Sequence, residues 1–144
     1  MKAFLGMGLL GSNFVKAMLR RGDEVQVWNR TASKAKALES DGAKAFDEVS
    51  DAVKGADVIH ITLKDDATVD EVLEKASAGL KPGAVIYDHT TTSVEGARKR
   101  TADWKAAGIP QWRNVPLRII NAAPCLTSFP LQTTIFRLWY EFAF

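Results

Sequence analysis

The chain has 144 residues, enough for one ordinary domain with its own core but short for two. Hydrophobic residues make up 47% and charged residues 25%, as in soluble globular proteins, which argues against disorder. The formal net charge of +2, with Lys and Arg mixed among Asp and Glu, gives no reason to expect a nucleic-acid partner. One cysteine, Cys125, excludes an internal disulfide framework, and two distant histidines offer no metal site, so a reducing, cytoplasmic setting is expected. No stretch reaches the about 18 uncharged apolar residues of a membrane span.

Short apolar runs alternate with amphipathic ones along the first 109 residues. Strands are predicted at 2–5, 24–28, 43–46, 57–63 and 84–87, and the fourth of these is apolar enough to be buried on both faces. Helices are predicted at 9–21, 32–40 and 48–54, and then from two sets of helically spaced residues: Val69, Val72, Leu73 and Ala76, followed by Val94, Ala97, Thr101 and Trp104. This alternation predicts an α/β fold, a Rossmann-type doubly wound parallel sheet with helices on both faces.

The composition changes after residue 109. All ten glycines lie at or before Gly108, whereas four of the five prolines follow it. Residues 110–144 are apolar and aromatic, contain no lysine, and show no sustained periodicity. The chain is therefore divided into a dinucleotide-binding domain at 1–109 and a divergent tail of uncertain structure at 110–144.

A glycine-rich motif, GMGLLG, lies between the first predicted strand and the first predicted helix. Its spacing matches G-x-G-x-x-G, and its place in a βαβ-length unit is the one found in dinucleotide-binding folds. Gly6 would permit the tight turn, Gly8 would let the backbone approach a pyrophosphate, and Gly11 would let helix and strand pack closely. The free N–H groups at the helix start would then hold the phosphates.

The end of the second predicted strand, where NAD-binding chains often carry Asp or Glu, reads Asn29-Arg30-Thr31. Asn29 removes the carboxylate that would repel a 2′-phosphate, and Arg30 offers a planar set of donors suited to one. Thr31 adds a hydroxyl at the start of the next helix, and Lys34 a second positive charge. These residues favour NADP(H) over NAD, although a polar surface turn would have the same composition.

Several segments together resemble the β-hydroxyacid dehydrogenase family, which includes 3-hydroxyisobutyrate and 6-phosphogluconate dehydrogenases and is related to imine reductases. The resemblance rests mainly on FLGMGLLG, VWNRT, ADVIHITLKDDATVDEVL and GLKPGAVIYDHTTTS, in the expected order. It implies that the pyrophosphate is surrounded by Gly6, Met7, Gly8, Leu9, Leu10 and Gly11. It also implies that Thr62, Leu63 and Lys64 lie along the cofactor.

The family's D-x-S-T pattern falls on residues 88–91. By this resemblance Thr90 stands where a serine holds the substrate carboxylate, and Thr91 lies near the nicotinamide. The family is an oxidoreductase family that moves a hydride between the cofactor and a small hydroxyacid, semialdehyde or imine. Its catalytic lysine lies in a helical C-terminal domain for which this chain has no counterpart, so no catalytic residue is assigned and it is left undecided whether the chain is itself an enzyme.

Other reactive residues have plainer interpretations. His60, inside an apolar strand, is expected to be a core histidine with a satisfied ring nitrogen, while His89 is equally compatible with a functional and a turn role. Asp65 and Asp66 are expected to cap a helix rather than to form an acid/base pair. Cys125 is expected to pack as a small apolar group.

Two alternatives concern the tail. Its aromatic residues, Trp112, Phe136, Trp139, Tyr140 and Phe142, are compatible with a surface for a homodimer or a partner subunit, which would make the chain a non-catalytic NADP-sensing or partner-binding module. The abrupt loss of glycine and lysine is also what an out-of-frame continuation of a longer gene would produce. Translation of the other two reading frames past residue 109 distinguishes these cases.

Overall fold

The computed structural model describes residues 1–106 and 111–114. The strands are β1 (Lys2–Leu5), β2 (Val25–Trp28), β3 (Lys44–Phe46), β4 (Val58–Ile61), β5 (Val85–Asp88) and β6 (Gln111–Asn114). The helices are α1 (Leu9–Arg20), α2 (Ala32–Lys36), α3 (Val49–Val53), α4 (Asp66–Ala76) and α5 (Val94–Ala106), with 3₁₀ turns η1 (Glu39–Asp41) and η2 (Ser77–Gly79). No helix in these two ranges is both long and apolar enough to cross a membrane.

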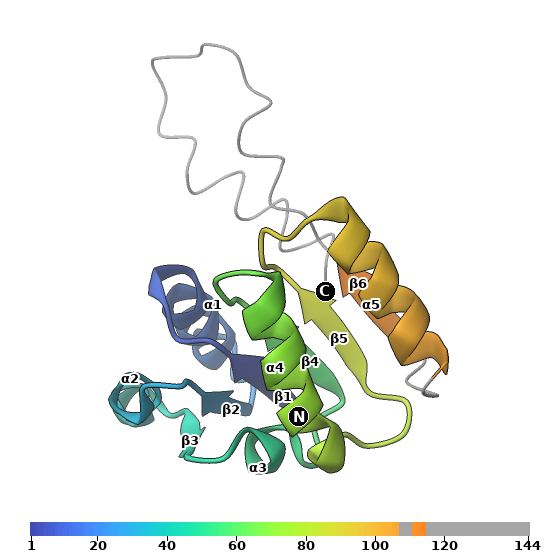
Figure 1. Cartoon of the computed structure of the whole chain (residues 1–144). Helices are drawn as coiled ribbons and strands as arrows, with labels where there is room; N and C mark the ends of the chain where they lie inside the picture. Colours follow the sequence, from blue (N-terminus) through green and yellow to red (C-terminus); the bar gives the residue numbers. More distant parts are fainter. Residues whose placement is uncertain (107–110, 115–144) are drawn as a thin grey trace, which may run out of the picture.

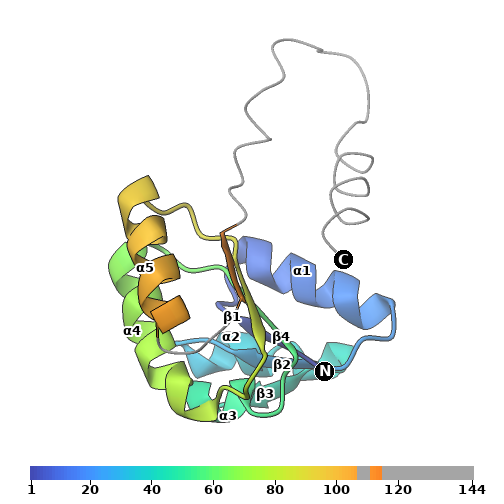
Figure 2. The same ribbon diagram turned by 90° about the vertical axis from the view of Figure 1, so that its right-hand side faces the viewer.

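The six strands form one parallel sheet in the order β3-β2-β1-β4-β5-β6 (Figure 1). The chain starts at the centre with β1, runs outward to β3, crosses back to β4 and continues to the opposite edge. Figure 2 shows α1 on one side of the sheet and α4 and α5 on the other. This is the doubly wound arrangement of a Rossmann fold, and it confirms the predicted fold class.

Alternating side chains of the central strands build a separate core on each face of the sheet. Phe4 points to the α1 side, where it packs with Phe14, Val15 and Met18. Its neighbours in β1 point to the opposite face, which has the larger core: Leu5, Ile59, Ile61, Val69, Leu73 and Ile86. All four residues predicted for the inner side of α4 are buried, so the apolar spacing identified that helix correctly.

The inner face of α5 differs from the prediction. Val94 is 66% exposed and Thr101 is also exposed. Arg100, which was not among the residues predicted for the inner face, is only 4% exposed. The reason lies in α4, which offers the carboxylates of Asp66 and Asp70 to the Arg100 guanidinium. The two helices therefore meet partly through an ion-paired contact, which a search for apolar spacing cannot detect.

Two element boundaries also differ from the predictions. The single helix expected at 32–40 ends at Lys36, because the amide of Leu38 bonds to the carbonyl of Ala35 in a tighter, three-residue turn. The sheet continues past residue 109, since β6 pairs with β5 in parallel register from Gln111 to Asn114. The other predictions for residues 115–144, including those for Cys125 and the aromatic residues beyond Trp112, lie outside the described residues.

Candidate functional site

The carboxyl ends of β1, β2, β4 and β5 meet at one edge of the sheet. The strand order extends in one direction from β1 to β3 and in the other direction from β4 to β6. The connections that follow β1 and β4 therefore lead to opposite faces of the sheet. A crevice at such a switch point is where doubly wound folds bind their ligands. The residues predicted to bind the cofactor all follow one of these four strand ends.

Gly6 and Gly11 are required by close backbone packing at the end of β1. Gly6 has a φ of +103°, and a Cβ there would lie 2.1 Å from the carbonyl oxygen of Thr62. A Cβ on Gly11 would lie 2.0 Å from the Gly6 carbonyl oxygen. The hydroxyl of Thr62 donates to that same Gly6 oxygen over 2.8 Å, which joins the end of β4 to the glycine loop.

Gly8 is different, because no atom lies within 4 Å of the position its Cβ would occupy. It is exposed and precedes the first turn of α1 in an extended conformation, with φ −77° and ψ −171°. The first turn of α1 contains no acidic residue, so its free N–H groups and the positive end of the helix dipole face the space beside Gly8. Leu9, the next residue, is 88% exposed.

A cleft of about 270 Å³ lies in front of this helix start. It brings together the loops that follow three strands, and its lining residues are Gly8, Leu9, Leu10, Gly11, Thr62, Leu63, Lys64, His89, Thr90 and Thr91. Nine of these ten residues were predicted from the sequence to bind cofactor or substrate, and His89 is the addition. Gly6 and Met7 are buried behind this surface rather than lining it.

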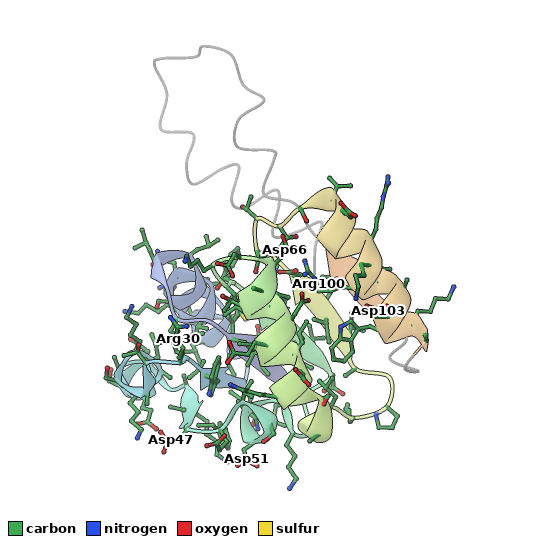
Figure 3. The ribbon with its side chains drawn as sticks, viewed as in Figure 1. Arg30, Asp47, Asp51, Asp66, Arg100 and Asp103 are labelled. Carbon is green, nitrogen blue, oxygen red and sulfur yellow. The ribbon has the colours of Figure 1, made fainter. Side chains whose placement is uncertain are left out.

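The turn after β2 is attached to the glycine loop but does not line the cleft. The side-chain oxygen of Asn29 accepts a 2.9 Å hydrogen bond from the Met7 amide, and its amide nitrogen donates to the Thr31 carbonyl over 3.0 Å. Asn29 thus fixes its own turn against the glycine loop. Arg30, Thr31 and Lys34 are all exposed, and Figure 3 shows Arg30 between α1 and α2.

The loop that follows β5 forms the other side of the cleft. Thr90 is only 3% exposed, and its hydroxyl oxygen accepts a 3.0 Å hydrogen bond from the Leu63 amide. Its own amide donates to Oδ1 of Asp88 over 2.9 Å. Because the Thr90 hydroxyl acts as an acceptor toward Leu63, its proton is directed to the Asp88 side chain, with which it also forms a hydrogen bond. Burial raises the pKa of the Asp88 carboxyl, against the opposing effect of the Thr90 amide.

His60 and His89 form a buried pair behind this loop. Nδ1 of His60 lies 3.0 Å from Nε2 of His89, and the ring centroids are 5.3 Å apart with planes 14° from parallel. The two imidazoles therefore meet edge to edge, nearly in one plane, with one proton between the facing nitrogens. Burial, followed by the charge of His89, lowers the pKa of His60 to about 3, and burial lowers the pKa of His89 to about 4.

The predicted burial of His60 is confirmed, but its partner was missed. His60 lies opposite Tyr87 in the β4–β5 register, so His89 is its diagonal neighbour on the same face of the sheet. Each histidine is alone in its own stretch of sequence. Only the pairing of β4 with β5 relates them. Asp65 does cap α4, by accepting from the Thr68 amide, whereas Asp66 accepts from the Ser93 amide at the start of α5.

The site fits a dinucleotide: it combines an open place beside Gly8, a free helix start and a cleft that runs between the loops after β1, β4 and β5. Residues 2–113 match the family described as the NAD binding domain of 6-phosphogluconate dehydrogenase. This match confirms the predicted family and, at the level of NAD or NADP, the predicted cofactor.

Known proteins with the same fold include enzymes. The chain is 33% identical over 104 residues to an uncharacterized oxidoreductase of Shewanella frigidimarina, covering 69% of this chain and 36% of that protein. It is also similar to the imine reductase of Myxococcus stipitatus in complex with NADP+, at 31% identity and a TM-score of 0.75, covering 81% of this chain and 40% of that one. A variant of that reductase in complex with NAD+ matches at 27% identity, also with a TM-score of 0.75, over 81% and 40% of the two chains.

One similar protein is named as a nuclear factor rather than as an oxidoreductase or reductase. The cytokine-like nuclear factor N-PAC of Homo sapiens is 34% identical over 95 residues, which cover 64% of this chain and 17% of that protein. The chain thus spans about a third of the length of the Shewanella relative, and less of N-PAC.

Proposed function

This chain belongs to the family of NAD binding domains of 6-phosphogluconate dehydrogenase, and from that premise we propose that it binds NADP(H) in preference to NAD(H). In this proposal the pyrophosphate lies on the start of α1, the 2′-phosphate lies at Arg30, and the nicotinamide lies between the loops after β4 and β5. The cofactor would supply hydride transfer to or from a small hydroxyacid, semialdehyde or imine.

The observation that carries the proposal is the empty Cβ position of Gly8. Gly6 and Gly11 are glycines because the protein's own backbone occupies the space beside them, but nothing in the described protein occupies the space beside Gly8. A glycine with no internal steric reason, placed at an N-terminal helix end that carries no acidic residue, is what a phosphate site needs. The pyrophosphate is the group that would fill this space.

The preference for NADP(H) rests on the turn after β2. Asn29 is uncharged and held in place by Met7 and Thr31, so it presents no carboxylate to a 2′-phosphate. Arg30 and Lys34 are both exposed, so their charged groups are accessible to a ligand. Two accessible cations beside a neutral amide support recognition of the additional phosphate.

The nicotinamide side involves Thr62, Leu63, Lys64, Thr90 and Thr91. The Thr90 hydroxyl accepts from Leu63 and bonds to the Asp88 side chain, so in the role given to it by the resemblance its proton would turn from Asp88 to a substrate carboxylate. Lys64 is the lysine of this cleft, but its side chain is 86% exposed and lies 3.6 Å from Asp65, in a setting that does not prepare it for proton transfer. We therefore propose that the acid/base group is supplied from outside the described residues, and that the described residues bind the cofactor with little or no turnover of their own.

Calorimetric titration with NADPH and NADH tests the proposal. We expect NADPH to bind at least about tenfold more tightly, since one charged hydrogen-bonded contact is worth about 1.5–3 kcal/mol. Arg30→Ala should remove most of that difference and leave NADH binding almost unchanged. Lys36→Ala is the matched control, because Lys36 is another exposed cation of the same region but pairs with Asp47 over 3.0 Å. Equal affinities for the two cofactors in the unmodified chain would refute the preference.

A second candidate is a non-catalytic dinucleotide-sensing module whose partner is another protein, and it draws support from a relative that is named as a nuclear factor rather than as an oxidoreductase. In this case NADPH would bind but would change the assembly of the chain rather than undergo reaction. Size-exclusion chromatography and crosslinking with and without NADPH separate the two candidates. A mass that does not respond to NADPH argues against the sensing module.

A further inference from the structure

We propose that Arg100 is a positioning residue for the nicotinamide side of the cleft, acting through Asp66 on the loop of residues 89–93. This loop carries Thr90 and Thr91, which line the cleft, and it connects β5 to α5. The proposal rests on the proposed function, because Arg100 would help to fix the position of the loop that faces the nicotinamide.

Arg100 is a charged side chain almost removed from solvent. Its side chain is 5% exposed, Nη1 donates to Oδ1 of Asp70 over 3.0 Å, and Nη2 donates to Oδ1 of Asp66. Figure 3 shows Arg100 and Asp66 directed toward each other between α4 and α5. A guanidinium this deeply buried is tolerated only when it is paired, so its two carboxylates fix its place.

Asp66 uses its second oxygen for the loop. Oδ2 accepts a 2.9 Å hydrogen bond from the amide of Ser93, the last loop residue before α5. The approach depends on Gly96, because a Cβ there would lie 2.3 Å from Oδ1 of Asp66. The Ser93 amide, followed by Arg100, keeps the pKa of Asp66 below its ordinary value, so the carboxylate is charged when it makes these bonds.

The opposite end of the loop is anchored independently. Asp88 accepts from the Thr90 amide, and the Thr90 hydroxyl oxygen accepts from the Leu63 amide. The loop is therefore held at its first residues by the end of β5 and at its last residue by Asp66. Thr91 lies between these two anchors and is itself exposed.

Arg100 determines where Asp66 points. The Asp66 side chain is 36% exposed and can turn toward water, so without the guanidinium its contact with Ser93 competes directly with solvent. Asp70 also pairs with Arg100, but among the described residues it forms no hydrogen bond to the loop. Both carboxylates therefore contribute to the packing of α4 against α5, but only Asp66 also holds the loop. Substitutions of Asp66 and Asp70 can distinguish these two effects.

The test compares Arg100→Met with Lys99→Met in the full chain. Both variants remove a cation from α5, but Lys99 is an exposed residue that pairs with Asp103 on the same helix. The first measurement is amide hydrogen exchange of Ser93 without cofactor. We expect Arg100→Met to accelerate it by about tenfold or more and Lys99→Met to leave it unchanged, because the Ser93 amide loses its ordered acceptor only in the first variant. Unchanged Ser93 exchange in a folded Arg100→Met protein overturns the proposal.

The second measurement compares NADPH with adenosine 2′,5′-bisphosphate, which lacks the nicotinamide half. Arg100→Met should weaken NADPH by roughly threefold to tenfold and change the bisphosphate affinity by less than about twofold. Asp66→Ala should reproduce this pattern and Asp70→Ala should not. Equal losses for both ligands would make Arg100 a purely structural residue and contradict the assignment. Failure of the unmodified chain to bind either ligand would instead refute the proposed function, while Ser93 exchange still decides whether the loop is anchored by Arg100.

Discussion

The two sides of the cleft are held in place by different means. On the α1 side, residues 6–11 pack so closely against other backbone that Gly6 and Gly11 leave no room for a Cβ, and the side chains of Asn29 and Thr62 add two hydrogen bonds. On the other side, the His89 amide bonds to the Ile61 carbonyl, but the rest of residues 89–93 is held mainly by the side chains of Asp88, Thr90 and Asp66. The first side has no alternative arrangement that keeps the fold, whereas the second can move when a single hydrogen bond is lost.

The difference suggests a division of labour. A pyrophosphate is common to all dinucleotides, so a rigid site for it at the centre of the fold does not restrict which substrate the protein can act on. The wall beside the nicotinamide faces whatever is reduced or oxidised, and an arrangement held by side chains can be adjusted without disturbing the sheet. Substitutions of Gly6 and Gly11, which pack against the protein's own backbone, should therefore change stability, and those in residues 89–93 should change mainly binding.

Gly6→Ala should have the largest effect. It would place a Cβ 2.1 Å from the Thr62 carbonyl oxygen at a residue with φ +103°, and we expect a loss of about 3 kcal/mol or more in the free energy of unfolding. Gly8→Ala is the matched substitution two residues away, where no atom lies within 4 Å. It should change stability by less than about 0.5 kcal/mol and reduce NADPH affinity by at least about tenfold. Urea denaturation and calorimetry measure the two quantities. Comparable losses of stability in both variants would contradict the distinction between the glycines.

The buried histidine pair predicts a stability that falls in mild acid. The folded pKa values of His60 and His89 are lowered to about 3 and about 4 from an ordinary 6.5, so below pH 6.5 the unfolded chain binds protons that the folded chain does not. Stability is then constant above about pH 7 and decreases toward pH 4, by up to about 1.4 kcal/mol per pH unit for each histidine. Lys2 contributes to the shift of His60, and Phe4, Phe14 and Tyr87 surround the pair.

Thermal denaturation between pH 7 and 5 measures this dependence. The window excludes the carboxylates with lowered pKa values, Asp65, Asp66 and Glu71, which affect stability only near and below their ordinary values of 3.8 and 4.5. The raised pKa of Asp88 acts in the opposite direction to the histidines, because its folded carboxyl keeps a proton to higher pH than the unfolded one, and this contribution is the same in the variant described next. A double variant, His60→Gln with His89→Gln, removes the titration while two amides can still bond to each other. Its melting temperature should be nearly flat over the same window. An equally steep decline in the double variant would place the acid sensitivity elsewhere.

The smallest expected effect concerns the connection between the two sides. Thr62→Val removes the hydroxyl that donates to the Gly6 carbonyl and keeps the side-chain shape. A buried carbonyl left without this donor should cost about 1 kcal/mol in the free energy of unfolding. Thr101→Val is the control, because Thr101 also donates to a carbonyl, that of Ala97, but is exposed. If the two valine variants lose the same stability, the Thr62 contact does not hold the glycine loop.

The same contrast explains which features were predictable. The glycine loop and the alternation of strands and helices are local patterns, so the sheet and the phosphate loop followed from the sequence, whereas residues 62–64 and 90–91 of the cleft were assigned through the family resemblance. The contacts of Asp66 with Ser93, of Arg100 with Asp66 and of His60 with His89 join residues about thirty positions apart. They depend on strand register and helix rotation, which single residues do not encode. The predicted inner face of α5 did not include Arg100, because a charged side chain is rarely buried without partners and its partners lie on another helix.

The strand β6 was missed for a related reason. QWRN lacks both a continuous apolar run and a clear alternation, and it follows the change in composition at residue 109. Its pairing with β5 is what makes it a strand. An edge strand can form on an existing sheet with little sequence preference of its own.

The most direct test of the account is to map where NADPH binds by following backbone amide chemical shifts during a titration. We predict that the largest changes occur at the amides of Gly8, Leu9 and Leu10, with further changes at residues 62–64 and 90–91 and at Arg30. NADH should reproduce the changes at the glycine loop but not those at Arg30. Changes confined to other surfaces, or a glycine loop that does not respond to saturating NADPH, would contradict the assignment of this cleft as the dinucleotide site.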